Sequence, residues 1–205
     1  KTGKHFDTRK RIEIYAELKK EKNVGIAYSS NSYFNEKKMN IFPLSGLSYV
    51  ETINCNESGY FALYESDRYG FNNLDEEWDN KEIEYLLIGD SFLDGSCVNR
   101  PHDISSVLRT LSNKSVLNLG YSGNGPLIEF ATLREYGSPL QPKNVFWLYY
   151  INDIENLFKD YTTINARKVG KVVDWLNYIG KYIIEFHFFT DLLIIFIHFE
   201  IKLLS

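Results

Sequence analysis

Apolar and polar positions repeat differently along the chain, and this change divides it into two parts. Residues 8–22 place apolar side chains at helical spacing among charged ones, which predicts a surface helix. Residues 23–44 are irregular and rich in Asn, Ser and Lys, so we expect a loop or a wrapping arm there. Residues 52–73 alternate around the turn-forming segment 56–59, which predicts a β-hairpin. We therefore take residues 1–82 as an accessory segment with an amino-terminal helix and a hairpin.

From residue 83 onward, short apolar runs alternate with helical patterns. The apolar runs predict strands at 84–88, 115–119 and 144–150. The intervening and following segments predict helices at 101–112, 126–136 and 153–159. In the first of these helices, Val107, Leu108 and Leu111 are expected to share a face. Strands and helices that alternate at this length form right-handed parallel βαβ units, so residues 83–205 are expected to be an α/β domain.

The last part of the chain is its most apolar. Residues 171–180 predict a further helix, and the apolar stretch 182–204 follows it. This stretch is interrupted by Glu185, His187, Asp191, His198 and Glu200. A membrane-spanning helix needs about 20 mostly uncharged residues, and the stretch fails that requirement. We expect a buried element or one that a partner covers.

Composition and charge exclude some classes of protein. Apolar residues make up 44% of the chain and charged residues 24%, so a folded core is expected. The net charge of −4 argues against a nucleic-acid partner, which would need a basic surface. The chain begins with Lys1 rather than Met, so it is expected to be a mature form, an excised piece or a fragment. The compartment stays open, with a periplasmic location or membrane association through flanking sequence as the expectations.

Only two cysteines occur, Cys55 and Cys97. Two free buried thiols are one interpretation. In an exported protein, a single disulfide between the accessory segment and the loop after Ser91 is the other. The sequence does not decide between them, because it does not give the distance between the two Cα atoms.

The residues that follow the predicted strands carry the candidate chemistry. The first strand ends in Gly89, Asp90 and Ser91. A serine in such a turn either serves as an exposed nucleophile or caps the next helix. Residues 118–125 and Asn152–Asp153 follow the next two strands, and sites in open α/β sheets form at these carboxyl ends. The sequence has no metal-ligand spacing, no GxxxxGK[ST] and no GxGxxG after the first strand, so no metal and no cofactor are expected.

Taken in order, these blocks resemble the SGNH (GDSL-like) hydrolase superfamily. Residues 89–92 match its Gly-Asp-Ser block, and residues 118–123 match its second block with Gly123 at the glycine. The third block is matched by Asn152 and Asp153 without the leading glycine. The resemblance covers about residues 83–160. More loosely, the segment 66–73 looks like what precedes the first block in bacterial members associated with surface polysaccharides.

The resemblance implies a flavodoxin-like three-layer parallel sheet and a serine-dependent acyl-ester hydrolase or O-acyl (acetyl) transferase. Ser91 would be the catalytic nucleophile. The backbone N–H groups of Ser91 and Gly123 and the side-chain amide of Asn152 would bind the oxyanion. The substrate would be a small acyl ester or an acylated carbohydrate. Loss of one oxyanion donor typically costs about 2.7–4 kcal/mol of transition-state stabilisation.

The chain departs from the family at the catalytic base. The family's fourth block, Asp-x-x-His, has no counterpart, since none of the four histidines follows an aspartate by three residues. His102 is expected at the surface or at a helix start, and His187 and His198 are expected to be hydrogen-bonded core residues. We expect the chain to stop before the fourth block. The alternatives are a non-catalytic module of the same fold that binds a glycan or an anion, and a decayed gene product.

Overall fold

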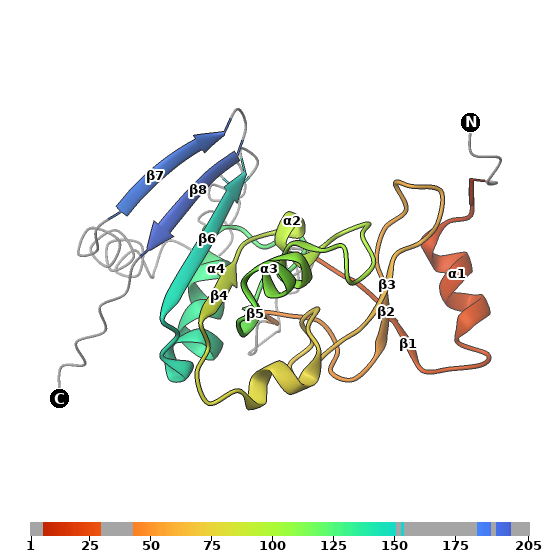
Figure 1. Cartoon of the computed structure of the whole chain (residues 1–205). Helices are drawn as coiled ribbons and strands as arrows, with labels where there is room; N and C mark the ends of the chain where they lie inside the picture. Colours follow the sequence, from red (N-terminus) through yellow and green to blue (C-terminus); the bar gives the residue numbers. More distant parts are fainter. Residues whose placement is uncertain (1–5, 30–42, 151–152, 154–183, 190–191, 198–205) are drawn as a thin grey trace, which may run out of the picture.

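The computed structural model describes residues 6–29, 43–150, 153, 184–189 and 192–197. These residues form a mixed α/β structure with a five-stranded sheet and a three-stranded sheet. Figure 1 shows the two sheets side by side, with the smaller one built from the amino-terminal part of the chain. Apart from Asp153, which is helical, the helices predicted at 153–159 and 171–180 lie outside the described residues.

The small sheet confirms two of the predicted amino-terminal elements. Its strands are β1 (Val24–Ile26), β2 (Glu51–Ile53) and β3 (Leu63–Glu65), preceded by the helix α1 (Arg11–Leu18). β2 and β3 are antiparallel, as the hairpin prediction requires, and α1 packs Ile14 against Val24 and Ile53. The prediction of a loop over residues 23–44 is wrong at β1, because these residues form a strand that pairs in parallel with β2. Three residues are too few to show alternation in the sequence, and β1 forms because its Val24 completes a core supplied by other elements.

The larger sheet contains the three predicted strands. They are β4 (Tyr85–Ile88), β5 (Val116–Asn118) and β6 (Asn144–Tyr150). All three are parallel in the order β5-β4-β6, with Leu86 of β4 level with Leu117 and Val145. After β4 the chain forms β5 on one side of it and then crosses over to form β6 on its other side.

Both faces of these strands are covered, and alternate residues serve the two faces. Leu86 and Ile88 lie in the same cluster as Leu133, which follows α4 (Pro126–Thr132) in a π turn. Leu87 instead contacts the opposite cluster, with Leu93 of α2 (Ser91–Asp94) and Leu108 of α3 (Ile104–Ser112). Burying a leucine side chain stabilises the fold by about 1.5–3 kcal/mol, so the two-sided burial fixes the register of β4.

The described residues of the apolar stretch 182–204 form two strands. β7 (Ile184–Phe189) and β8 (Leu192–Ile197) pair antiparallel, and β8 pairs antiparallel with β6. The parallel-sheet prediction is therefore wrong for this edge, and the sheet is mixed. Two residues separate β7 from β8, a connection that joins only antiparallel strands. Among the residues that the structure describes, no helix has the length and apolar character needed to span a membrane.

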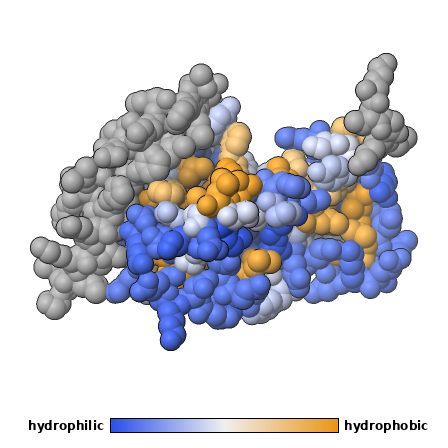
Figure 2. All heavy atoms as spheres, viewed as in Figure 1, coloured by the Kyte–Doolittle hydropathy of each residue, from blue (hydrophilic) through white to orange (hydrophobic). Residues whose placement is uncertain are grey.

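The apolar face predicted for the helix at 101–112, which is α3, is wrong in part. Leu108 packs against the sheet, but Val107 is exposed and Leu111 is 81% exposed. The buried face instead carries Ser105 and Ser106, which hydrogen bond to the Asp103 side chain at the helix start. The hydrogen bonds to Asp103 place the short serines on the buried side of α3. Its larger apolar residues are therefore exposed, and Figure 2 shows apolar atoms at the surface in the region of α2 and α3.

Side chains close the outer edge of β5. The Asn73 amide donates to Asn118 O at 2.7 Å, and Asn118 N donates to Asn73 Oδ1 at 2.9 Å. Arg109 Nη2 donates to Val116 O at 2.8 Å, and Arg109 Nε lies 2.6 Å from Glu77 Oε1. The backbone groups on this side of the strand thus have partners without a further strand.

The loop before β4 is organised around a buried aspartate. Asp67 Oδ1 accepts from the backbone N–H groups of Tyr69 at 2.8 Å and Phe71 at 3.0 Å. Asp67 Oδ2 accepts from Asn73 Nδ2 at 2.8 Å and Trp78 Nε1 at 2.7 Å. Phe71 lies in the core of the larger sheet, so contacts of this loop cross the domain boundary predicted at residue 82.

Candidate functional site

The turn after β4 leaves the Ser91 hydroxyl unused as a helix cap. Asp90 is the N-cap of α2, and its Oδ1 accepts from Phe92 N at 3.0 Å. The interpretation of Ser91 as the cap is therefore wrong, because the residue before it has that role. Ser91 is the first residue of α2, and its partly buried Oγ lies 3.5 Å from Asp90 Oδ2. A contact of that length is weak, so the hydroxyl is weakly held.

Ser91 follows β4, where the connection from β4 to β5 and the connection from β5 to β6 run to opposite sides of the strand. β5 and β6 flank β4, and ligands of open α/β sheets bind outside the carboxyl ends at such a point. The carboxyl end of β6 lies next to α2, since the ring centroids of Phe92 and Tyr150 are 4.5 Å apart. Tyr150 N in turn donates to the buried Asp153 at 2.7 Å. The predicted oxyanion residue Asn152 lies outside the described residues.

The loop after β5 holds Gly123 in a conformation that suits glycine. Gly123 has a φ of +80°, and a Cβ there would lie 2.0 Å from Ser29 Oγ. Earlier in the same loop, a Cβ on Gly120 would lie 2.8 Å from Asp94 N. The loop that carries Gly123 is therefore packed directly against α2, which begins with Ser91.

The described histidines do not complete a catalytic pair with Ser91. His102 is exposed just before α3, as predicted, and Asp103 is the cap of that helix. The backbone of His187 lies in β7, three strands away from β4, or about 14 Å. His5 and His198 lie outside the described residues. Within the part of the chain that the structure describes, the base for Ser91 is not a histidine hydrogen-bonded to it.

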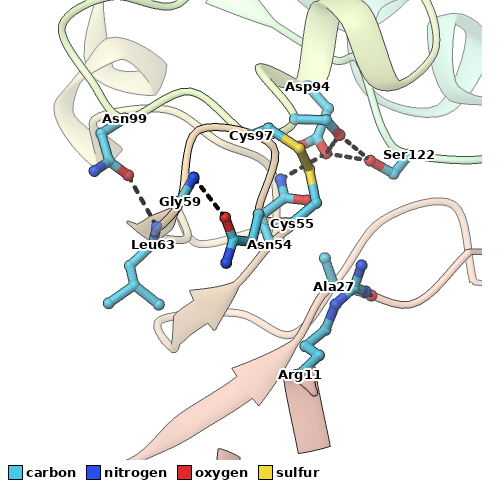
Figure 3. Close-up of a disulfide and its surroundings, with 12 residues drawn as sticks. Arg11, Ala27, Asn54, Cys55, Gly59, Leu63, Asp94, Cys97, Asn99 and Ser122 are labelled. Carbon is cyan, nitrogen blue, oxygen red and sulfur yellow. Dashed lines mark hydrogen bonds between the residues drawn. A yellow bond between two sulfur atoms is a disulfide. The ribbon is translucent and has the colours of Figure 1, made fainter. Parts of the chain in front are cut away.

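Sequence reasoning missed a buried carboxylate at the end of α2. Asp94 is fully buried, and its Oδ2 accepts from Ser122 Oγ at 2.5 Å, Asn54 Nδ2 at 3.2 Å and Ser96 Oγ at 3.3 Å (Figure 3). Burial raises the pKa of Asp94 to about 6, against the opposing effect of these hydrogen bonds. One aspartate among polar turn residues gives no sequence signal of this kind, because its partners come from distant segments.

A disulfide lies beside this carboxylate. Cys55 and Cys97 are bonded, with their Cα atoms 4.7 Å apart, so the interpretation as free thiols is wrong. Figure 3 shows the bond close to Asp94 and Ser122. It joins the segment between β2 and β3 to the loop after α2.

Two further searches, for metal ligands among the described residues and for similar proteins, found nothing. The described residues contain no group of three or more His, Cys, Asp or Glu side chains that could hold a metal ion. No protein-family model matches the sequence, and comparisons with curated proteins and with solved structures found no match.

The raised pKa of Asp94 predicts how stability changes with pH. Its carboxyl group has a pKa of about 6 in the folded chain and an ordinary value of 3.8 when unfolded. The folded state therefore holds this proton more tightly, and stability falls as the pH rises between these values. Ionisation of Asp94 should cost about 3 kcal/mol above pH 6, a cost that Asp94→Asn removes. In urea unfolding at pH 4.5, 6 and 7.5, the free energy of unfolding of Asp94→Asn should increase relative to that of the wild type as the pH rises.

The exposed Asp79 provides the control for this measurement. Asp79→Asn removes a carboxylate that is 64% exposed, so it should change the free energy of unfolding by less than about 1 kcal/mol. A difference between Asp94→Asn and wild type that is the same at all three pH values would contradict the prediction.

Proposed function

We propose that this chain is a serine-dependent acyl-ester hydrolase or O-acyl transferase of the SGNH type, with Ser91 as the nucleophile. The observation that carries the proposal is the position of the Ser91 hydroxyl. It stands after β4, the middle one of the three parallel strands, on the first residue of α2, while Asp90 caps the helix. A nucleophilic serine needs a hydroxyl that is not used to cap the helix, and the weak 3.5 Å contact with Asp90 leaves the Ser91 hydroxyl available to a base.

The arrangement of the sheet supports the finer fold assignment. The order β5-β4-β6 is the order of the first three strands of a flavodoxin-like sheet, with helices on both faces. In that fold the ligand site lies outside the first and third strands, which correspond here to β4 and β6. A flavodoxin-like three-layer sheet therefore accounts for where Ser91 and Asp153 occur.

The proposed reaction is acyl transfer through a serine ester. Ser91 Oγ attacks the carbonyl carbon of the ester, and its proton passes to a base. The N–H groups of Ser91 and Gly123 and the amide of Asn152 stabilise the oxyanion. The alcohol leaves with a proton, and water or an acceptor hydroxyl then takes the acyl group from Ser91. The proposal requires that the base come from outside the described residues, and the proposed substrate is a small acyl group on a carbohydrate.

The test is covalent labelling of the serine. In the full-length protein, a fluorophosphonate probe should attach to Ser91, located by peptide mass spectrometry, and p-nitrophenyl acetate should be hydrolysed. Ser91→Ala should lose both signals while keeping the circular dichroism spectrum. Ser112→Ala, at the end of α3, is the matched control and should keep both signals. Turnover that persists fully in Ser91→Ala would overturn the proposal.

One observation favours a second candidate function. Ser29 Oγ lies 2.0 Å from where a Cβ on Gly123 would be, so a second hydroxyl lies beside the loop that carries Gly123. The same turn and loop would then bind a glycan or an anion without catalysis. In that case the wild type would resist the probe, and glycan binding measured by calorimetry would be saturable and insensitive to Ser91→Ala.

A further inference from the structure

Four segments of the chain meet at Asp94. The carboxylate oxygen Oδ2 accepts hydrogen bonds from Asn54, Ser96 and Ser122, as Figure 3 shows for Ser122. Ser96 Oγ and Ser122 Oγ also lie 2.6 Å apart. The backbone carbonyl of Asp94 accepts from Asn72 Nδ2 at 2.8 Å. The cluster thus joins the hairpin segment, the loop before β4, α2 and the loop after β5.

This cluster connects directly to two of the three residues proposed to contact the oxyanion, Ser91 and Gly123. Asp94 ends the helix that Ser91 begins, and Asp94 N donates to Asp90 O at 3.0 Å. Ser122 directly precedes Gly123 in the chain. One carboxylate oxygen therefore connects the helix of Ser91 to the neighbour of Gly123 by a hydrogen bond of 2.5 Å.

The carboxylate is held without a cation in the described part of the chain. The groups that act on its ionisation are burial, the three donors and the charge of Asp90, while Tyr64 faces it from β3. Hydrogen bonds to a charged acceptor are shorter and about twice as strong as neutral ones. Asn54, Ser96 and Ser122 converge on this one oxygen, and the Ser96 and Ser122 hydroxyls share two protons among their three short contacts.

We propose that Asp94 is a positioning residue, which fixes Ser122 and thereby the Gly123 N–H relative to Ser91. This inference rests on the proposed function, because it concerns the same oxyanion site. A displacement of about 1 Å in such a donor can lower the rate of an enzyme about 100-fold. The amino-terminal segment then has a defined role, since Asn54 donates to the same carboxylate oxygen.

Kinetics of two variants test the positioning role. Asp94→Asn and Ser122→Ala should each lower kcat about 10–100-fold and leave KM nearly unchanged, because the donor acts on the transition state. Ser105→Ala is the matched control, since Ser105 also donates to a buried aspartate but lies in α3. It should keep the wild-type kcat. Equal losses in all three variants would overturn the inference and indicate a general effect on folding.

A second measurement does not need activity. In protein labelled with ¹⁵N-glycine, the amide signals of Gly95 and Gly123 should shift with pH at an apparent pKa of about 6, the value given by Asp94. Asp94→Asn should abolish both shifts, and Ser122→Ala should reduce that of Gly123 alone. A Gly123 signal that does not titrate in the wild type would overturn the inference.

The two proposals fail in different ways. An active wild type whose Asp94→Asn and Ser122→Ala variants keep full kcat would overturn the positioning role and leave the proposed function in place. An inactive and unlabelled wild type would overturn the proposed function and, with it, the role in acyl transfer. The coupling of Asp94 to Gly123 would still be measured by the amide titration.

Discussion

Removal of the Cys55–Cys97 disulfide is expected to lower the free energy of unfolding by about 4 kcal/mol. The bond joins cysteines that are 42 residues apart, and it restricts the unfolded chain by closing a loop of that length. The folded chain also loses a fixed link between the hairpin segment and the loop after α2. Urea unfolding of Cys55→Ser/Cys97→Ser beside the oxidised wild type measures the difference.

Reductant provides the internal control. The double variant should unfold at the same urea concentration with and without a phosphine reductant, whereas the wild type should shift toward the variant when reduced. If oxidised and reduced wild type unfold together, the disulfide contributes no stability and the expectation is wrong.

Asp67→Ala is expected to destabilise the chain by about 3–5 kcal/mol, the usual result of breaking a buried polar network. The variant leaves four donors without their acceptor, from Tyr69, Phe71, Asn73 and Trp78. Each unsatisfied buried donor typically costs about 1–3 kcal/mol, and relaxation of the loop recovers part of the sum. Chemical unfolding monitored by tryptophan fluorescence reports the change, since Trp78 is one of the donors.

The neighbouring Asp79 distinguishes burial from charge in this experiment. Asp79 pairs with Arg68 and is 64% exposed, so Asp79→Ala should cost less than about 1 kcal/mol. Asp67→Asn, which keeps one acceptor oxygen, should fall between the two. Similar losses in Asp67→Ala and Asp79→Ala would show that the buried network is not the source of the effect.

The strands were predictable where a continuous apolar run meant burial on both faces. β6 begins and ends at the predicted residues, β4 begins one residue later than predicted, and β5 is one residue shorter than predicted at each end. Local patterns failed where the fold depends on distant partners. β1 was missed because its neighbour β2 lies 25 residues further on, and the exposed side of α3 was missed because the Asp103 cap sets its rotation.

The candidate site divides in the same way. The turn around Ser91 and the special conformation of Gly123 follow from strand ends and glycine, which are local features. Asp94 was missed because its importance comes from Asn54 and Ser122, which approach it from other segments. The sequence left the pairing of the cysteines open for the same reason.

The closed edge of β5 has a consequence for how molecules of this protein behave toward one another. A free edge strand presents backbone groups that can recruit a strand from another chain and start aggregation. Here the Asn73 amide occupies the N–H and C=O of Asn118, and Arg109 occupies the carbonyl of Val116. An incoming strand would have to displace all three hydrogen bonds and separate Arg109 from Glu77. This side of the sheet is therefore protected against intermolecular strand addition by three side chains.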